Sequence, residues 1–253
     1  MAEQRSFRVE AVVLRHADWG EADRLLTLYT RERGKVRAIA KGARRIRSRK
    51  AGHLEPFTRV VLQLAKGRDL LIVTQADTAE AYLPLRDDLV KTGHAAYVVE
   101  LIDRFTYEDE TENVLAFRLL TDTLARIAAE PDVWLAVRYY EVRLLDLVGF
   151  RPQLFSCVRC GEKILPRDQF FSPLAGGVLC PKCGAGLPGA WAISVDALKH
   201  FRHFQRSSYP EARRARPGLE VRNELETLLQ KHFTYLLERE LNSPGFLKSI
   251  ARK

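Results

Sequence analysis

The stretch LLTLYTRERGKVRAIAKG, residues 25–42, holds two β-prone runs separated by a charged turn. Leu25–Thr30 and Lys35–Ala40 are rich in apolar, branched and aromatic side chains, which favour strands. Arg31–Gly34 lies between them and ends in glycine, so we expect a hairpin turn there. The stretch therefore predicts two neighbouring antiparallel strands in the N-terminal part of the chain.

Three further runs extend this hairpin to five strands. Apolar residues alternate from Phe7 to Val13, as in a strand with one buried face. Phe57–Ala65 and Leu70–Gln75 are two more β-prone runs, separated by a turn at 66–69. Five short strands in so short a segment suit a small closed barrel, and the OB-fold is a five-stranded barrel that binds nucleic acids. An SH3-like barrel fits the same spacing.

From about residue 86 the apolar residues recur with a helical period. We expect helices at Asp87–Phe105, Asn113–Ala129 and Val133–Val148, another from an N-cap at Ser194 to Phe204, and a last one at Leu219–Leu241. Pro244 and Gly245 should end the last helix, and 206–218 should form an exposed loop. The predicted fold class is α+β, with an OB-fold barrel at 1–80 and a helical domain at 81–253.

Four cysteines interrupt the helical part at about 155–190. Their spacing is C-x2-C, nineteen residues, then C-x2-C, which is typical of a zinc site with four thiolate ligands. Glycines 161 and 184 follow the two pairs, where a turn around a metal favours a residue free to take positive φ. Residues 169–179 should form a short hairpin that turns at Gly176-Gly177. The pattern predicts an inserted zinc-ribbon module with one structural Zn ion bound by Cys157, Cys160, Cys180 and Cys183.

Three other interpretations of the cysteines remain open at this point. Two disulfides are possible on paper, but a cytosolic chain disfavours them. A thioredoxin-like site needs one C-x-x-C motif beside a βαβ unit, rather than two motifs in a loop. A catalytic zinc usually has His or carboxylate ligands and an open coordination position.

Positive charge is concentrated in the predicted barrel. The chain has 253 residues and a net charge of +9, and residues 1–80 carry 17 Lys and Arg against 10 Asp and Glu. The remainder is nearly balanced, so an anionic partner is expected at the barrel, with nucleic acid the leading candidate. Six cations fall within residues 41–50, and Trp19, Tyr29 and Phe57 are possible platforms for stacking bases.

Several function classes are disfavoured by what the sequence lacks. It contains no run of 18 uncharged apolar residues and begins without the apolar segment of a secretory signal, so we expect a cytoplasmic protein. It has no G-x-x-x-x-G-K-[ST] loop, no H-E-x-x-H and no G-x-S-x-G motif. We therefore expect a binding protein rather than an enzyme, with no catalytic residues.

The order of these features resembles the RecO family of bacterial recombination mediators. The resemblance is carried by GKVRAIAKGAR at 34–44, by YEVRLLDLVGF at 140–150 ahead of the first cysteine pair, and by VVL at 12–14 followed by GEADR at 20–24. It spans nearly the whole chain. It implies an N-terminal OB-fold, a helical domain and a four-cysteine zinc module.

The resemblance also implies a function in DNA repair. RecO proteins bind single- and double-stranded DNA, anneal complementary strands, and help RecR load RecA onto DNA coated by single-strand-binding protein (SSB). The DNA contacts implied by the matching segment are Lys35, Arg37, Lys41, Arg44 and Arg45, and charge alone adds Arg47, Arg49 and Lys50. Family members also bind the C-terminal tail of SSB through the helical domain, where Arg138 and Arg143 are candidate contacts.

Two alternatives from other classes accompany this interpretation. An OB-fold combined with a zinc ribbon would also suit an RNA-binding protein of a translation or transcription assembly. A nuclease or ligase fragment is a third hypothesis, but the chain has neither a K-x-D-G motif nor a cluster of acids.

Overall fold

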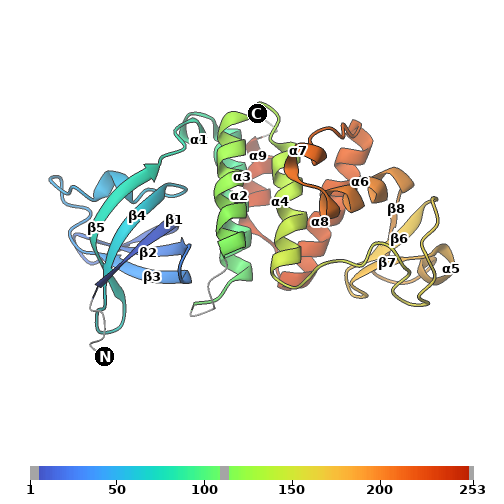
Figure 1. The fold of residues 1–253 in the computed structure, drawn as a ribbon, viewed down its shortest axis with the longest axis horizontal. Helices are drawn as coiled ribbons and strands as arrows, with labels where there is room; N and C mark the ends of the chain where they lie inside the picture. The colour runs from blue at the N-terminus through green and yellow to red at the C-terminus, as the bar shows by residue number, and fades with distance from the viewer. Residues whose placement is uncertain (1–5, 109–113, 251–253) are drawn as a thin grey trace. The chain divides into compact units, whose positions relative to one another are not determined.

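The computed structural model describes residues 6–108 and 114–250 (Figure 1). Its contacts divide the chain into unit 1, Met1–Val133 with Asn242–Lys253, and unit 2, Trp134–Leu241. The predicted domains instead divide at residue 80. The first helices group with the barrel in unit 1, where Asp103 of helix α2 (Leu89–Phe105) pairs with two barrel side chains, Arg15 and Lys35. Each unit is described separately below.

Unit 1 begins with a closed five-stranded barrel. Its strands are β1 (Ser6–Trp19), β2 (Asp23–Thr30), β3 (Gly34–Ala40), β4 (Arg59–Ala65) and β5 (Leu71–Glu80). They are ordered β1-β2-β3-β5-β4, with β1 returning to β4 in antiparallel register and β3 pairing in parallel with β5. The predicted OB-like barrel and its hairpin at 31–34 are confirmed.

The barrel core explains why the loop between β3 and β4 is ordered. Alternating side chains point inward, as in β4, where Val60, Leu62 and Leu64 are buried. Two residues of the 41–58 connection, Ala43 and Leu54, are fully buried in the same core. The connection also includes the 3-10 helix η1 (Ala51–His53). Its two ends are therefore packed against the barrel.

The helices of unit 1 are α1 (Pro84–Asp87), α2 (Leu89–Phe105), α3 (Val114–Ala129) and α9 (Asn242–Ile250). The helix predicted at Asp87–Phe105 is confirmed from Leu89, where the Asp88 side chain accepts hydrogen bonds from Val90 N and Lys91 N and forms the N-cap. The helix predicted to begin at Asn113 is confirmed from Val114, and Asn113 itself lies outside the described residues.

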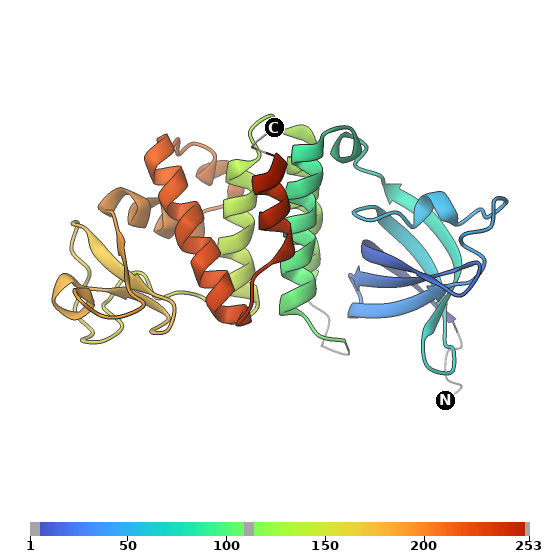
Figure 2. The same ribbon diagram turned by 180° about the vertical axis from the view of Figure 1, so that it is seen from behind.

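The prediction that the last helix ends the chain's regular structure was wrong. Helix α9 lies beside α2 (Figure 2). Pro244 is in its first turn, where no intrahelical N–H is required. The Glu100 carboxylate of α2 accepts hydrogen bonds from the backbone N–H groups of Asn242 (3.0 Å) and Ser243 (2.9 Å). A Cβ on Gly93 would lie 2.6 Å from Leu247, so glycine permits this close approach.

Unit 2 packs helices α4 (Trp134–Leu147), α6 (Val195–Arg206) and α8 (Leu219–Leu237) together. The helices predicted in these regions are confirmed. The prediction of an exposed loop at 206–218 was only partly correct, because this segment contains α7 (Tyr209–Ala212). Ser208 and Glu211 form its capping box, and Tyr209 is buried edge-on against Tyr139, with ring centroids 5.3 Å apart.

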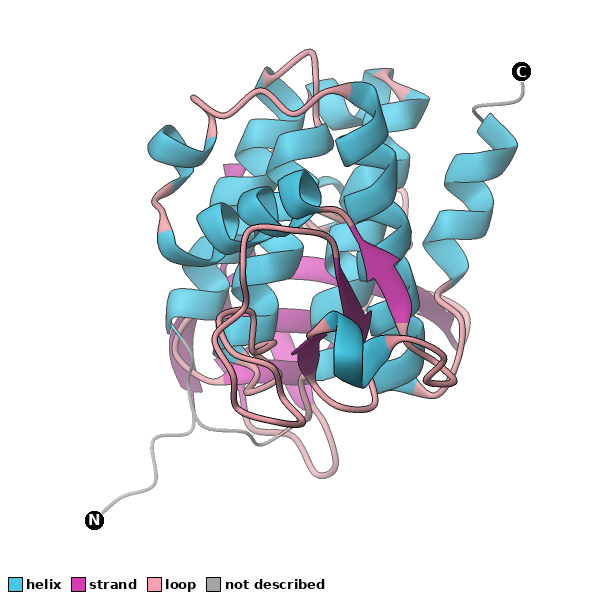
Figure 3. Cartoon of the chain, turned by 90° about the vertical axis from the view of Figure 1, so that its right-hand side faces the viewer, coloured by secondary structure: helices cyan, strands magenta, loops and turns pink. Residues whose placement is uncertain are grey.

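The cysteine segment of unit 2 forms a small sheet (Figure 3). The predicted hairpin is confirmed as β6 (Gln169–Ser172) and β7 (Gly177–Leu179), and β8 (Trp191–Ile193) adds a third strand that was not predicted. A one-turn helix, α5 (Pro181–Gly184), begins directly after Cys180 and contains Cys183.

Candidate nucleic-acid interface and metal centre

The basic loop, residues 41–50, leaves β3 by a sharp turn that is fixed by hydrogen bonds. Gly42 has φ +66°, and its N–H donates to Asp23 Oδ1 at 2.7 Å. The N–H of Arg44 donates to the carbonyl of Ala22 at 2.9 Å. The start of the basic loop is thus attached to the turn between β1 and β2.

Four cations of the basic loop have no side-chain partner among the residues that the structure describes. Lys41, Arg45, Arg47 and Arg49 are all exposed. Within residues 6–108 and 114–250, their side chains make no ion pair or hydrogen bond. An exposed guanidinium or ammonium group without a carboxylate partner is available to a phosphate.

Two other cations of the loop are engaged in holding it. Arg44 pairs with the Asp18 carboxylate at 3.2 Å and donates to the carbonyl of Gly20 at 3.2 Å. Lys50 Nζ donates to the carbonyl of Val73 at 3.1 Å. Burial lowers the pKa of Lys50, although the carboxylate of Asp23 acts in the opposite direction.

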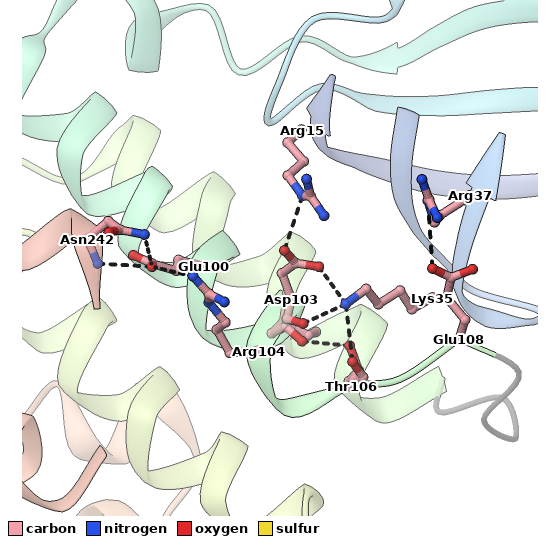
Figure 4. A network of polar contacts seen from close by, with 10 residues as sticks. Arg15, Lys35, Arg37, Glu100, Asp103, Arg104, Thr106, Glu108 and Asn242 are labelled. Carbon is pink, nitrogen blue, oxygen red and sulfur yellow. Dashed lines mark hydrogen bonds and ion pairs between the residues drawn. The ribbon is translucent and has the colours of Figure 1, made fainter. Parts of the chain in front are cut away.

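Lys35 and Arg37 of β3 face the helices of unit 1 (Figure 4). Lys35 Nζ lies 2.6 Å from the Asp103 carboxylate and donates to the carbonyls of Asp103 (2.6 Å) and Thr106 (3.2 Å). Its side chain is only 14% exposed. Arg37 pairs with Glu108 at 3.8 Å. Lys35 therefore attaches the barrel to α2, and the basic strand face expected from period two is already partly neutralised by the protein.

Replacing Lys35 with methionine is expected to destabilise unit 1 and to leave DNA affinity nearly unchanged. The change leaves Asp103 with Arg15 alone, 3.3 Å away, and removes donors from two carbonyls. A cost of about 1–3 kcal/mol in unfolding free energy follows. Chemical denaturation and fluorescence anisotropy with a labelled oligonucleotide measure the two effects. The matched control, Lys41→Met, should show the reverse pattern, and equal losses of affinity would assign Lys35 to the DNA interface.

Of the three aromatic residues considered as stacking platforms, one is open to solvent. Tyr29 is buried, so it is a core residue and not a platform for bases. Phe57 is partly buried on a backbone with φ +70°. Trp19, at the end of β1, is 51% exposed.

The four cysteines meet as the spacing predicted. The sulfur atoms of Cys157, Cys160, Cys180 and Cys183 all lie within 4.8 Å of one another. A zinc ion with four Zn–S bonds of about 2.3 Å places its sulfurs about 3.8 Å apart, so the cluster fits a tetrahedral ion. All four cysteines are free thiols, which departs from the two-disulfide alternative. The cluster can hold one metal ion.

Backbone turns aim the sulfurs at a common point. Gly161 has φ +77°, as expected, and its N–H donates to the carbonyl of Cys157 at 2.8 Å. The same expectation for Gly184 was wrong, because this residue lies in α5. Glycine is required there for packing, since a Cβ would lie 2.5 Å from Phe170.

The first cysteine has an environment that favours its thiolate. Burial raises the pKa of Cys157, but hydrogen bonds from the backbone of Cys180, Cys160 and Arg159 outweigh burial and lower the pKa to about 6. The thiolate is the form that binds metals.

The two arginines suggested as partner contacts lie in different environments. Arg138 is 3% exposed, and its Nε lies 3.0 Å from the carboxylate of Glu141, which is fully buried. Its predicted contact with a partner is corrected to a structural role, because a buried side chain offers no surface. Arg143 is 37% exposed and donates to the carbonyl of Gln205 at 2.8 Å.

Comparison with known proteins covers both halves of the chain. Residues 1–82 match the family model for the N-terminal part of recombination protein O, and residues 86–244 match the model for its C-terminal part. The chain belongs to the RecO family. No helix in the described part of this RecO-family chain is both long and apolar enough to cross a bilayer.

Curated members of the RecO family match the chain over nearly its full length. A DNA repair protein RecO from Roseiflexus sp. strain RS-1 is 41% identical over 246 residues, which cover 97% of this chain and 86% of the relative. Those from Dehalococcoides mccartyi and Symbiobacterium thermophilum are each 34% identical, and they cover 100% and 96% of this chain and 99% and 97% of the relatives. Membership of this family supports a role in recombinational DNA repair.

Proposed function

We propose that this chain is a DNA-binding recombination mediator. It binds single- and double-stranded DNA, anneals complementary strands, and acts with RecR to load RecA onto SSB-coated DNA in the cytoplasm, at the nucleoid. The observation that carries the proposal is the set of four exposed cations on the basic loop that have no partner in the described part of the chain. They extend from an OB-like barrel, a fold that commonly binds single strands.

Annealing of this kind requires charge neutralisation and no catalytic site. Two complementary strands repel through their phosphates, and cations that bind phosphate reduce this repulsion while leaving base edges free to pair. Lys41, Arg45, Arg47 and Arg49 supply this charge. Arg44 and Lys50, which are attached to the barrel, hold the loop and add to the local positive potential.

The partners and the metal have separate proposed roles. RecR and the SSB tail bring the mediator to coated DNA, and Arg143 is the remaining candidate contact for the acidic tail because it is partly exposed. We assign zinc to the four cysteines as a structural ion of unit 2. When bound, it supplies four metal–thiolate bonds that hold the 155–190 segment together.

Changing Arg45, Arg47 and Arg49 together to alanine is expected to weaken binding of single-stranded DNA roughly 50-fold at 0.15 M salt. Loss of three phosphate contacts should reduce the slope of log K against log salt by about 2, since each contact contributes about 0.7. Fluorescence anisotropy across a salt series measures both quantities. Annealing of complementary strands coated with SSB, with and without each protein, tests the functional consequence.

The matched control is Arg213, Arg214 and Arg216, all changed to alanine. These are also three exposed arginines within a short stretch, but they lie in unit 2. The control variant should bind and anneal like the unchanged chain. Unaltered affinity in the basic-loop variant would refute the assignment, and equal competition by RNA of the same sequence would favour the RNA-binding alternative.

A further inference from the structure

Two large apolar side chains are exposed among the cations at the loop end of the barrel. Ile46 lies between Arg45 and Arg47 and has a relative exposure of 103%, so it packs against nothing in the described protein. Trp19 is 51% exposed at the end of β1. Single exposed apolar residues are common on proteins. This pair is distinguished by its surroundings, which are positively charged and fixed by hydrogen bonds.

The backbone around Ile46 is held on both sides. The N–H of Arg45 donates to the carbonyl of Gly42 at 3.2 Å, and the N–H of Ser48 donates to the carbonyl of Arg45 at 2.9 Å. This second bond closes a turn whose central residues are Ile46 and Arg47. Ala43, just before the turn, is buried in the barrel core. The turn therefore presents the Ile46 side chain to solvent.

Arg44 connects this turn to Trp19. Its guanidinium group binds the Asp18 carboxylate at 3.2 Å and the carbonyl of Gly20 at 3.2 Å, the residues on either side of Trp19. One arginine thus links the strand end that carries Trp19 to the loop that carries Ile46. The two apolar side chains belong to the same end of the barrel, next to the unpartnered cations.

We infer that Ile46 inserts between neighbouring bases of single-stranded DNA while Trp19 stacks on a base nearby. Apolar side chains, isoleucine among them, insert between base steps of duplex DNA in minor-groove binding proteins, and exposed aromatic rings stack on single-stranded bases of any sequence. The arginines on either side would hold the phosphates that flank the opened step. This inference rests on the proposed DNA-binding function and adds a contact to bases that the cations alone do not provide.

The charges argue for nucleic acid over a protein partner. An apolar pocket on another protein would have to accept Arg45 and Arg47 together with Ile46, at a desolvation cost for two unpaired guanidinium groups. A nucleic acid pairs an apolar base face with phosphates on both sides. This is the chemical pattern of the loop: an apolar side chain between two cations.

The test measures base stacking directly. A single-stranded oligo-adenylate containing one 2-aminopurine becomes more fluorescent when the base step beside the probe is opened. The unchanged chain should increase this signal at saturation, and Ile46→Ser should abolish the increase and weaken binding about tenfold, the size of one lost base contact. The slope of log K against log salt should stay the same, since all cations are retained. Trp19→Ala should also lower affinity about tenfold.

The matched control is Leu174→Ser, which removes an apolar side chain that is 74% exposed in unit 2. It should leave both the fluorescence and the affinity unchanged. If Ile46→Ser retains the full fluorescence increase and full affinity, the insertion is refuted. This holds even if the triple arginine variant of the basic loop binds weakly, because that result supports only the proposed function. If the unchanged chain shows no salt-dependent binding, the proposed function itself fails. If Ile46→Ser binds DNA normally but loses self-association, the Ile46 side chain is assigned to contacts between copies of the chain and the insertion is refuted.

Discussion

If the four cysteines hold a structural zinc, replacing Cys157 with serine is expected to abolish metal binding and unfold the 155–190 segment. A serine hydroxyl does not ionise near neutral pH, so the site keeps three thiolates and loses the ligand with the most favourable backbone environment. Structural zinc contributes roughly 10 kcal/mol or more to the folding of small metal-binding modules. Most of the segment's stability should therefore depend on the ion, because its sheet consists of three strands of three or four residues.

The experiment combines metal analysis with proteolysis. The unchanged chain should contain about one zinc per molecule, and the variant close to none. Trypsin should then cut the variant rapidly at Arg159, between the two cysteines of the first pair, and at Lys163, just after that pair. DNA affinity should stay close to normal, since the basic loop belongs to unit 1.

Ser156→Ala is the matched control for this experiment. It changes the residue next to Cys157 and removes a hydroxyl that is not a metal ligand. It should retain zinc and resist trypsin. A Cys157→Ser protein that keeps stoichiometric zinc, or one that resists trypsin as the control does, would contradict the structural assignment.

The barrel and the cysteine cluster were predictable because their signals are local. Alternation of apolar residues along β1 and β4 predicts which face of each strand is buried. The short turn between β2 and β3 predicts that these two strands pair. The spacing of each C-x2-C pair determines its local geometry, since two residues between the cysteines form the turn that lets both sulfurs bind one metal. In both cases a few neighbouring residues determine the structure.

Helix α9 was not predicted because its stability comes from elsewhere in the chain. Pro244 and Gly245 are poor helix residues, and the helix is held at its N-terminus by Glu100, 142 positions before Asn242. Burial raises the pKa of Glu100, but hydrogen bonds from Asn242 and Ser243 outweigh it, so the pKa is lowered and the charged form is the one that caps the helix. No local sequence pattern predicts a contact between residues so far apart in the chain.

The same reason explains why the sequence did not distinguish the exposed cations from those that pair with other parts of the protein. Charge and period placed Lys35 with Lys41 on one face, yet Lys35 finds Asp103 68 residues later, while Lys41 finds no partner in the described ranges. The acid at 103 lies within an ordinary helical pattern. Its pairing follows from tertiary structure, which a single sequence does not display.

Replacing Glu141 with glutamine is expected to cost about 3–5 kcal/mol of unfolding free energy. The change leaves Arg138 buried in α4 without its closest carboxylate, and breaking a buried ion pair from one side costs about this much. Glu226 offers limited compensation, since its carboxylate lies 4.0 Å from Arg138 and its side chain is 42% exposed. Denaturant unfolding followed by the fluorescence of Trp134, on the same helix, reports the loss.

Two further variants test whether burial of the ion pair causes the loss of unfolding free energy. Arg143→Met breaks a pair with Asp146 on the same helix in which the arginine is 37% exposed, and it should cost less than about 1 kcal/mol from that pair. The double change Arg138→Met with Glu141→Leu replaces the pair with apolar side chains and should recover most of the stability. If Arg138 instead contacted a partner protein, its replacement in the double variant would weaken partner binding while the fold stayed intact. The buried position of Arg138 predicts a different result. The single change at Glu141 should destabilise unit 2, and the double change should leave both stability and partner binding nearly unchanged.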